Sequence, residues 1–382
     1  MKDLNIYFHI PYCKAKCRFC SFYVIPGRKS RLEEYFKSLQ KEILNYKEEL
    51  KNYNVKTIYV GGGTPSLVDS PYIVEVINLI KENYTVDSDC EISIETNPET
   101  ISSEKINDYI EVGVNRISIG LQSTDDNILK FMGRLYTFSE FKEKYSIVKS
   151  SEIQNINLDL IFGIPGLTLN TWQDTLQKTI DLEPAHISTY SLEVDPDSIF
   201  GYLEKRGRFK KMEENLDRKM YKVAKRILKA NKYNQYEISN FAKQGKECKH
   251  NLNIWSGQDY IGFGASSHSR FGSIRYNNIN NLEKYIELIS SNKDVKENVS
   301  QLSSNDLLNE RILLNLRTTK GIDLVKMNND FSINFVENFR TNINKLRDAK
   351  LIKMNSNNIW LTDKGQDLET IVDLELVNII DS

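Results

Sequence analysis

The stretch YFHIPYCKAKCRFCSF, residues 7–22, holds three of the chain's five cysteines, Cys13, Cys17 and Cys20. Their C-x3-C-x2-C spacing places three thiols on one short loop, where they can converge on a common point. Cysteine thiolates are the ligands that hold iron–sulfur clusters. Three thiolates are one fewer than the irons of a [4Fe–4S] cluster. The fourth iron would then offer an open site to a small molecule.

This loop resembles that of radical S-adenosylmethionine (SAM) proteins. In that family the amine and carboxylate of SAM chelate the open iron, and an electron passed to the sulfonium can cleave SAM to a 5′-deoxyadenosyl radical. The resemblance implies a [4Fe–4S] cluster on Cys13, Cys17 and Cys20, with SAM as a second cofactor. The chemistry belongs to these cofactors, and the protein positions them.

Two other uses of the cysteines stay open. A structural zinc site usually shows a fourth Cys or His near such a pair, and His9 precedes the loop, with Pro11 between. The three could also be unconnected core residues, although cysteine is scarce elsewhere, with only Cys90 and Cys248. Because these two are isolated, they fit a reducing compartment better than a disulfide framework.

Length and charge limit the class of protein. A chain of 382 residues can form one large α/β domain and a smaller one. With 51 Lys+Arg and 52 Asp+Glu, the net charge of −1 does not favour a nucleic-acid partner. The start lacks a basic segment followed by an apolar run, and no stretch approaches the roughly 18 apolar residues of a membrane span. We expect a soluble, cytoplasmic protein with no integral membrane segment.

Strand and helix patterns alternate along the first half of the chain. The apolar positions of residues 32–50 follow the 3.6-residue period of a helix. Such alternation predicts a parallel sheet, and six units suit a partial (βα)6 radical-SAM barrel of the α/β class. The predicted strands are Leu4–Ile10, Val55–Val60, Cys90–Glu95, Val114–Ile119, Ile156–Leu160 and His186–Ser191, and further predicted helices are Ser102–Val112, Thr124–Met132 and Asn170–Leu182.

Such folds place their chemistry at the carboxyl ends of the strands. The first strand runs into the cysteine loop, and the second runs into GGGTP, residues 61–65. Three glycines let the backbone approach a ligand, although a glycine-rich turn can be only a turn. Polar residues near other strand ends could bind an ammonium, a ribose or a carboxylate, or could be ordinary strand-end residues. They are Glu95, Gln122, Arg134 and Asp159.

Beyond the sixth strand the alternation breaks. Residues 192–208 form an excursion before a charged helix, Glu213–Lys232. We predict two domains, residues 1–290 and residues 301–382. The second has three helices and a hairpin, Leu351–Leu361, in an order that resembles a winged helix. It carries 10 Lys+Arg and 12 Asp+Glu, a net of −2, so a docking or substrate-covering role is favoured over DNA binding.

Nearly the whole chain resembles the family of oxygen-independent coproporphyrinogen III oxidases and their heme-chaperone relatives. The motifs are YFHIPYC (7–13), GGGTPS (61–66), ETNP (95–98), GVNRISIGLQS (113–123), NLDL (157–160) and YEISNF (236–241). The resemblance implies that Tyr7 and Glu95 contact cluster-bound SAM. It also implies an adjoining adenosyl or substrate region lined by Phe19, Gly62, Gly63, Thr64, Gln122, Arg134 and Asp159. From the sequence alone, Tyr7 and Phe19 could equally fill the core.

Two features separate the branches of this family. The oxidase has a fourth cysteine two residues after the third, where this chain has Phe22. The oxidase also has a long extension before its cluster loop, whereas Cys13 lies near the start here. Both features indicate the heme-chaperone branch, the HemW type, which lacks the oxidase activity.

A heme motif of that branch, His-Asn-x-x-Tyr-Trp, stands here as HNLNIW, with Ile254 in place of the tyrosine. The motif implies His250 as a ligand of heme iron and Trp255 as a packing partner. His268, at another glycine-rich turn, is the rival ligand. The leading hypothesis is a protein that binds a [4Fe–4S] cluster, SAM and heme or porphyrin, and passes heme to an acceptor protein. The alternatives are radical decarboxylation of coproporphyrinogen III and a radical SAM enzyme with another small substrate.

Overall fold

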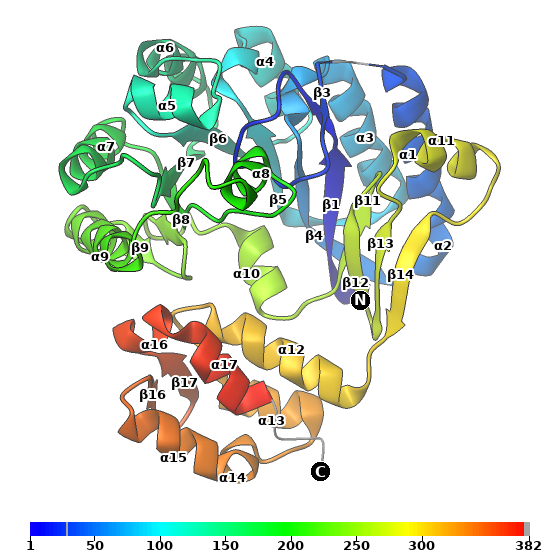
Figure 1. Ribbon diagram of the computed structural model, residues 1–382. Coiled ribbons are helices and arrows are strands. Elements are labelled where there is room, and N and C mark those ends of the chain that lie inside the picture. Colours follow the sequence, from blue (N-terminus) through cyan, green and yellow to red (C-terminus); the bar gives the residue numbers. More distant parts are fainter. Residues whose placement is uncertain (28–29, 378–382) are drawn as a thin grey trace.

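The computed structural model describes residues 1–27 and 30–377. Its centre is a run of six neighbouring parallel strands within a curved, 12-stranded sheet (Figure 1). In spatial order the six are β1 (Lys2–Ile10), β4 (Tyr53–Gly62), β5 (Thr85–Thr96), β6 (Arg116–Gln122), β7 (Asn155–Phe162) and β8 (His186–Ser191). All six predicted strands are present, so the prediction of a partial α/β barrel is confirmed.

Helices cover the outer face of this sheet (Figure 1). They are α1 (Leu32–Asn45), α2 (Lys47–Leu50), α3 (Ser70–Asn83), α4 (Ser103–Glu111), α5 (Asp126–Met132), α6 (Phe138–Lys149), α7 (Leu169–Asp181) and α9 (Glu214–Ala230). The sequence analysis did not predict α3 or α6. A signal for α6 was present, because Thr137 and Glu140 form a capping box at its start.

Short strands extend both edges of the six. The elements that complete this part of the chain are β2 (Tyr12–Cys13), β3 (Ile25–Pro26), η1 (Pro65–Leu67), η2 (Pro98–Thr100), α8 (Ile199–Lys205), β9 (Asn234–Gln235), β10 (Asn240–Ala242), α10 (Lys249–Trp255), β11 (Tyr260–Phe263), β12 (His268–Phe271), β13 (Ile274–Asn278), α11 (Leu282–Ser290) and β14 (Lys296–Gln301). β11 runs parallel to β1, whereas β10 and β12–β14 pair antiparallel with their neighbours. The sheet is therefore mixed at its edges.

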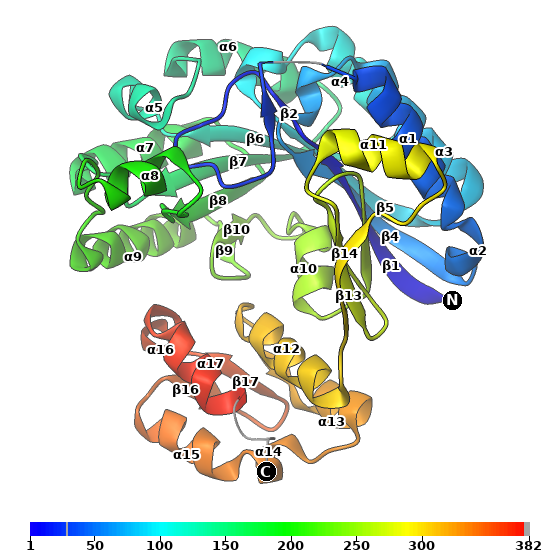
Figure 2. The same ribbon diagram turned by 45° about the vertical axis from the view of Figure 1, so that its right-hand side comes forward.

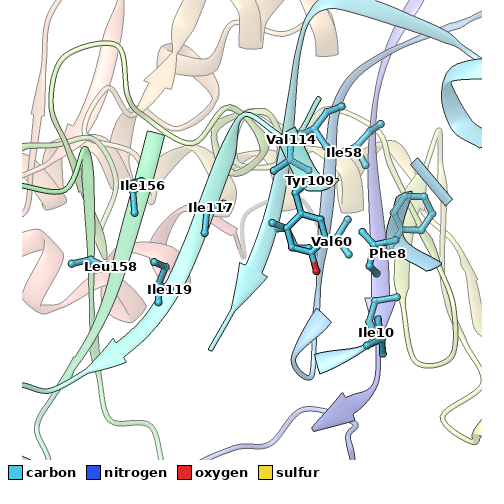
Figure 3. Close-up of a cluster of buried hydrophobic side chains, with 14 of the residues drawn as sticks. Phe8, Ile10, Ile58, Val60, Tyr109, Val114, Ile117, Ile119, Ile156 and Leu158 are labelled. Atoms are coloured by element: carbon cyan, nitrogen blue, oxygen red, sulfur yellow. The ribbon is translucent and has the colours of Figure 1, made fainter. Parts of the chain in front are cut away.

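The two faces of the central strands differ in chemistry. On β1, Ile6 and Phe8 are completely buried in the apolar core below the helices, while the alternating Asn5, Tyr7 and His9 belong to the inner face. The same alternation recurs on the other strands. Figure 3 shows the apolar side, where Tyr109 of α4 lies among side chains of the sheet. The barrel interior is consequently lined by polar groups.

The C-terminal part has its own apolar cluster, formed by residues 308–376. Its elements are α12 (Ser304–Leu316), β15 (Ile322–Asp323), α13 (Leu324–Phe331), α14 (Phe335–Asn338), α15 (Arg340–Asp348), β16 (Ile352–Met354), β17 (Asn358–Leu361), α16 (Asp363–Asp367) and α17 (Glu369–Val377). Four helices, α12 to α15, precede a hairpin that pairs with β15, one helix more than predicted, and the winged-helix-like order of helices followed by a hairpin is confirmed. Residues 378–382 of the predicted domain lie outside the described residues.

This C-terminal part packs against the barrel beside α10 (Figures 1 and 2). The Thr319 amide donates to the Tyr236 carbonyl at 3.0 Å, and Glu237 forms a β-bridge with Thr318. Arg311 donates to the Gly257 carbonyl at 3.2 Å. Among the helices that the structure describes, none combines the length and the apolar character needed to cross a membrane.

Candidate functional site

The cysteine loop leaves the carboxyl end of β1 and is closed at its base by the pairing of β2 with β3. The Gly27 amide donates to the Cys13 carbonyl at 2.9 Å, and the Cys20 amide donates to the Cys17 carbonyl at 3.2 Å. Arg18 ties the middle of the loop to two helices, since its amide donates to Met132 and its carbonyl accepts from Phe200. The loop is therefore held at a fixed place on the rim.

The three thiols of the loop lie near one another. Cys13 is buried, and Cys17 and Cys20 are half-buried. Burial raises the pKa of Cys13 to about 11, with smaller contributions from the other two cysteines. In residues 1–27 and 30–377, no three His, Cys, Asp or Glu side chains are close enough to hold one metal ion. In a [4Fe–4S] cluster each thiolate binds its own iron, and three thiols on one loop fit that ligand set.

A chain of side-chain contacts joins two of these cysteines through the neighbouring strand ends. Cys13 Sγ lies 3.5 Å from Thr64 Oγ1, which accepts from Asn97 Nδ2 at 2.9 Å. Asn97 Oδ1 accepts from Arg134, and Arg134 Nη1 donates to Cys17 Sγ at 3.2 Å. The guanidinium of Arg134 would thus stabilise a thiolate at Cys17. The predicted residues Thr64 and Arg134 are brought to the cluster loop.

The glycines after β4 are required by the protein's own packing. Gly62 has φ 111°, and a Cβ on it would lie 2.9 Å from the His9 ring. A Cβ on Gly63 would lie 2.7 Å from the Tyr12 carbonyl oxygen and 3.0 Å from Cys13 Sγ. Glycine is needed here to seat the cysteine loop on the strand. The predicted ligand contacts of Gly62 and Gly63 stay predictions.

Glu95 offers a carboxylate at the same rim. Its Oε1 accepts from the Tyr59 hydroxyl at 2.9 Å, and its Oε2 accepts from the Gly62 amide at 3.3 Å. Burial raises the pKa of Glu95 to about 7, and the negative charge of Asp159 adds to this effect. A cation bound beside Glu95 would favour its charged form. This environment fits SAM, which is a sulfonium cation.

Gln122 and Asp159 lie at the carboxyl ends of β6 and β7. Gln122 is buried at φ 65°, and its Oε1 has no hydrogen-bond partner among the described residues. A buried acceptor in a strained backbone position is a candidate contact for a ligand hydroxyl. Asp159 already accepts from Ser118 at 3.0 Å and from Asn157 at 2.8 Å. The predicted contact of Asp159 with a ligand stays a prediction.

The two aromatic residues predicted around the cofactor differ in position. The Tyr7 hydroxyl donates to His9 Nδ1 at 3.2 Å, and its ring stacks on Tyr59 with centroids 6.3 Å apart. Tyr7 therefore lies on the inner face beside Glu95. Phe19 is half-buried and packs against the main apolar cluster.

Tyr59 and Asn97 are rim residues that the sequence analysis left out of the site. Tyr59 binds Glu95, and Asn97 binds both Thr64 and Arg134. The sequence contains a signal for Asn97, because side chains two positions apart along a strand point to the same side. Asn97 follows Glu95 by two positions, so it points to the same side as a residue already predicted. Tyr59 had no predicted site residue two positions away.

The structure places His250 inside the barrel. Only 7% of its surface is exposed. Its Nδ1 lies 2.6 Å from Thr57 Oγ1, and its ring centroid is 5.0 Å from that of Tyr59. Burial lowers the pKa of His250 to about 3, with a smaller contribution from the charge of Arg116. The imidazole is therefore neutral and is held as part of the interior polar layer.

Trp255 lies at the other end of α10 and faces the C-terminal part. The guanidinium of Arg317 stands over its ring, 4.8 Å from the centroid, and its carbonyl accepts from Asn315 at 2.8 Å. His250 and Trp255 therefore lie at opposite ends of α10 and face different surroundings. The predicted rival, His268, begins β12 and is exposed.

Comparisons with known proteins agree with this geometry. The model of the radical SAM superfamily matches residues 7–179, and that of the HemN C-terminal domain matches residues 302–368. The heme chaperone HemW of Bacillus subtilis is 31% identical over 95% of this chain and 96% of its own length. The chain belongs to the HemW family. HemW of Escherichia coli is 35% identical over 71% of each chain.

A solved structure shares the HemW fold over the full chain. Coproporphyrinogen III oxidase (HemN) from Escherichia coli, a radical SAM enzyme, superposes with a TM-score of 0.86, covering 99% of this chain and 90% of that one at 21% identity. As a radical SAM protein of the HemW family, this protein uses a [4Fe–4S] cluster and SAM. A cluster held by Cys13, Cys17 and Cys20 would supply redox chemistry beside bound SAM. Thr64 and Arg134 would hold the thiolates of Cys13 and Cys17 in place. Glu95 would offer a negative charge to the SAM cation.

The role of Glu95 predicts a pH dependence of SAM binding. Because its folded-state pKa is raised to about 7, Glu95 is largely protonated at pH 6 and largely charged at pH 8. Only the charged form attracts a cation, so SAM affinity should rise across this range. Glu95→Gln should bind SAM about tenfold more weakly at pH 8, a loss of about 1.4 kcal/mol, and should lose this pH dependence. Anaerobic calorimetric titration of the cluster-loaded protein measures both, and equal slopes for the two proteins would exclude the role.

Proposed function

We propose that this protein is a cytoplasmic heme chaperone, which binds heme and passes it to an acceptor protein. The observation that carries the proposal is the similarity to HemW chaperones over 95% of the chain. Heme is the cargo in this proposal, whereas the cluster and SAM are resident cofactors. Neither the overall charge of −1 nor the composition of the C-terminal part favours a nucleic-acid partner.

Phe22 supports the chaperone over the oxidase. Its side chain is 65% exposed, two residues after Cys20, at the position where the oxidase carries a fourth cysteine. A phenyl group supplies neither a thiolate nor a proton. Any step of the oxidase that depends on that thiol is therefore not available to this chain.

The surroundings of the cysteine loop suit a flat apolar cargo. Large apolar side chains are exposed around it, although most such residues are buried elsewhere in the barrel. Leu135 follows Arg134, which binds Cys17, and Tyr202 belongs to α8, which contacts the loop at Arg18. The exposed apolar set of this rim is Phe22, Leu135, Tyr190, Ile199 and Tyr202.

Heme titration tests the proposal. Heme added to the purified protein should give a saturable Soret band, because the chain is similar to HemW chaperones and its rim exposes apolar side chains. The reduced, cluster-loaded protein incubated with SAM and coproporphyrinogen III should form no more protoporphyrinogen than a protein-free control. Protoporphyrinogen formation would replace the chaperone by the oxidase. Failure of both assays would favour a radical SAM enzyme that acts on another small substrate.

A further inference from the structure

The four histidines of the chain differ in how many of their ring nitrogens are already bound. His9 donates from Nε2 to the Tyr23 carbonyl at 2.9 Å, so its Nδ1 accepts from the Tyr7 hydroxyl at 3.2 Å. His186 is likewise bound at both ring nitrogens, over 2.6 Å and 2.8 Å. Neither of these imidazoles can bind a metal ion without losing a buried hydrogen bond.

His250 is bound at one ring nitrogen only. Its Nδ1 lies 2.6 Å from Thr57 Oγ1, whereas its Nε2 makes no hydrogen bond to any residue that the structure describes. Nε2 is not among the enclosed polar atoms without a partner in that part of the chain, so it reaches space that solvent can enter. His268 is exposed, and no hydrogen bond to another described residue orients its ring. His250 therefore combines one held nitrogen with one open nitrogen.

A chain of hydrogen bonds decides which nitrogen of His250 carries the proton. It starts at the Asp259 backbone carbonyl, which can only accept, so Asn5 turns its Nδ2 toward that oxygen at 3.1 Å. The Asn5 amide oxygen consequently faces Thr57 and accepts its hydroxyl proton at 2.8 Å. Thr57 has no second proton to give, so its Oγ1 accepts from His250 Nδ1–H. The lone pair is left on Nε2, the open nitrogen.

Burial makes this order of protons hard to reverse. Asn5 and Thr57 are completely buried and face each other in register on β1 and β4. The Asn5 oxygen also accepts from Asn253 Nδ2 at 2.8 Å, one turn along α10 from His250. The Glu91 carboxylate accepts from the His250 amide at 3.1 Å and so holds the start of the same helix. Turning one group around would leave a buried donor or acceptor without a partner, which is costly.

We propose that Thr57 is a positioning residue for heme iron, because it fixes the imidazole proton of His250 on Nδ1 and leaves the Nε2 lone pair for the metal. This inference rests on the proposed heme-binding function and deepens it. A histidine that binds a metal through one ring nitrogen usually donates from the other, and the acceptor fixes both the tautomer and the orientation of the ring. Here the acceptor is a hydroxyl that Asn5 orients in turn.

Thr57→Val and Thr57→Ser form a matched pair of variants. Valine has the shape of threonine but offers no acceptor, so Nδ1–H would lose its partner and the proton would move to Nε2, where solvent accepts it. The Asn5 oxygen keeps its hydrogen bond from Asn253, so the electronic change is confined to His250. Serine loses a methyl group but keeps the hydroxyl.

The tautomer is measured first, in the full-length protein without heme. Heteronuclear NMR of the protein with isotope-labelled histidine distinguishes a protonated ring nitrogen from a bare one, and His250→Ala identifies the signals. The proton should lie on Nδ1 in the unsubstituted protein and in Thr57→Ser, and on Nε2 in Thr57→Val. A proton on Nε2 in the unsubstituted protein overturns the inference.

Heme is then titrated into the same proteins with their cluster loaded. The Soret band is followed by difference spectroscopy, which removes the cluster absorbance. Thr57→Val should bind heme at least about tenfold more weakly, with a shifted Soret band and a changed reduction potential of the bound heme. Thr57→Ser should keep the original spectrum and affinity. Thr57→Val should change the residual heme binding of His250→Ala no further, because the hydroxyl acts through the imidazole.

The outcomes separate the two levels of the proposal. Absence of a Soret band in the unsubstituted protein overturns the proposed function, and the ligand role of His250 with it. A Soret band that Thr57→Val leaves unchanged in position and affinity overturns only the positioning role. Equal losses in Thr57→Val and Thr57→Ser overturn it as well, since they would trace the effect to the methyl group rather than to the hydroxyl.

Discussion

Cys17→Ala is expected to lose its iron–sulfur cluster almost completely. The substitution removes one of three thiolates, and its neighbours in the loop, Lys16 and Arg18, cannot replace a sulfur ligand. It also leaves the Arg134 guanidinium, which donates to Cys17 Sγ at 3.2 Å, without this acceptor. Iron and sulfide bound after anaerobic reconstitution should fall by more than about tenfold. Cys13→Ala and Cys20→Ala should behave in the same way.

Cys90→Ala is the matched control, since it removes a buried thiol far from the loop in sequence. Its Sγ donates only a weak contact to the Glu91 carbonyl, at 3.8 Å. Cys248→Ala is a less clean control, because Cys248 Sγ contacts the Glu91 carboxylate that holds α10. Full iron and sulfide loading in Cys17→Ala would refute the cluster assignment.

Gly63→Ala is expected to displace the cysteine loop. The new Cβ would lie 2.7 Å from the Tyr12 carbonyl oxygen and 3.0 Å from both the Ile10 carbonyl oxygen and Cys13 Sγ. Two of these three neighbours are backbone atoms, so the strand end or the loop must shift. We expect the free energy of unfolding to fall by about 1–3 kcal/mol and cluster loading to fall with it, as measured by chemical denaturation and by iron content.

Gly272→Ala provides the control for a comparable loss of stability that does not involve the cysteine loop. Gly272 has φ 59°, so alanine is strained there, but a Cβ would meet no atom within 4 Å. It should lose about 1–2 kcal/mol of stability and keep its cluster. Equal cluster loading in the two variants would show that the clash at Gly63 does not reach Cys13.

The central fold was predictable because each strand carries its own signal. Short apolar runs such as Val55–Val60 mark the parallel strands, and alternation with helices fixes their direction. The edges of the sheet were not predictable in this way. β9 and β10 are two and three residues long, and they exist because β10 pairs with β8, about 50 positions earlier in the chain. No local pattern encodes such a pairing.

The same distinction applies to the site. The cysteine loop and Glu95 are predictable, because strand ends of a parallel sheet meet at one rim. The position of His250 was not, because it depends on contacts with Thr57 and Glu91, 193 and 159 positions away. A motif identifies a residue that relatives share, but its burial depends on how the helix that carries it docks.

Side chains along β1 alternate between the apolar core and the barrel interior, so one strand serves both stability and binding. Ile6 and Phe8 face the helices and hold the barrel together, while Tyr7 and His9 face the interior, where we predict that the cofactor binds. Selection can therefore replace inward side chains with little effect on the apolar core. This separation accounts for a backbone that matches an oxidase with a TM-score of 0.86 although only 21% of the residues are identical. An ancestral barrel could diverge toward new cargoes one inward position at a time, without passing through an unfolded intermediate form.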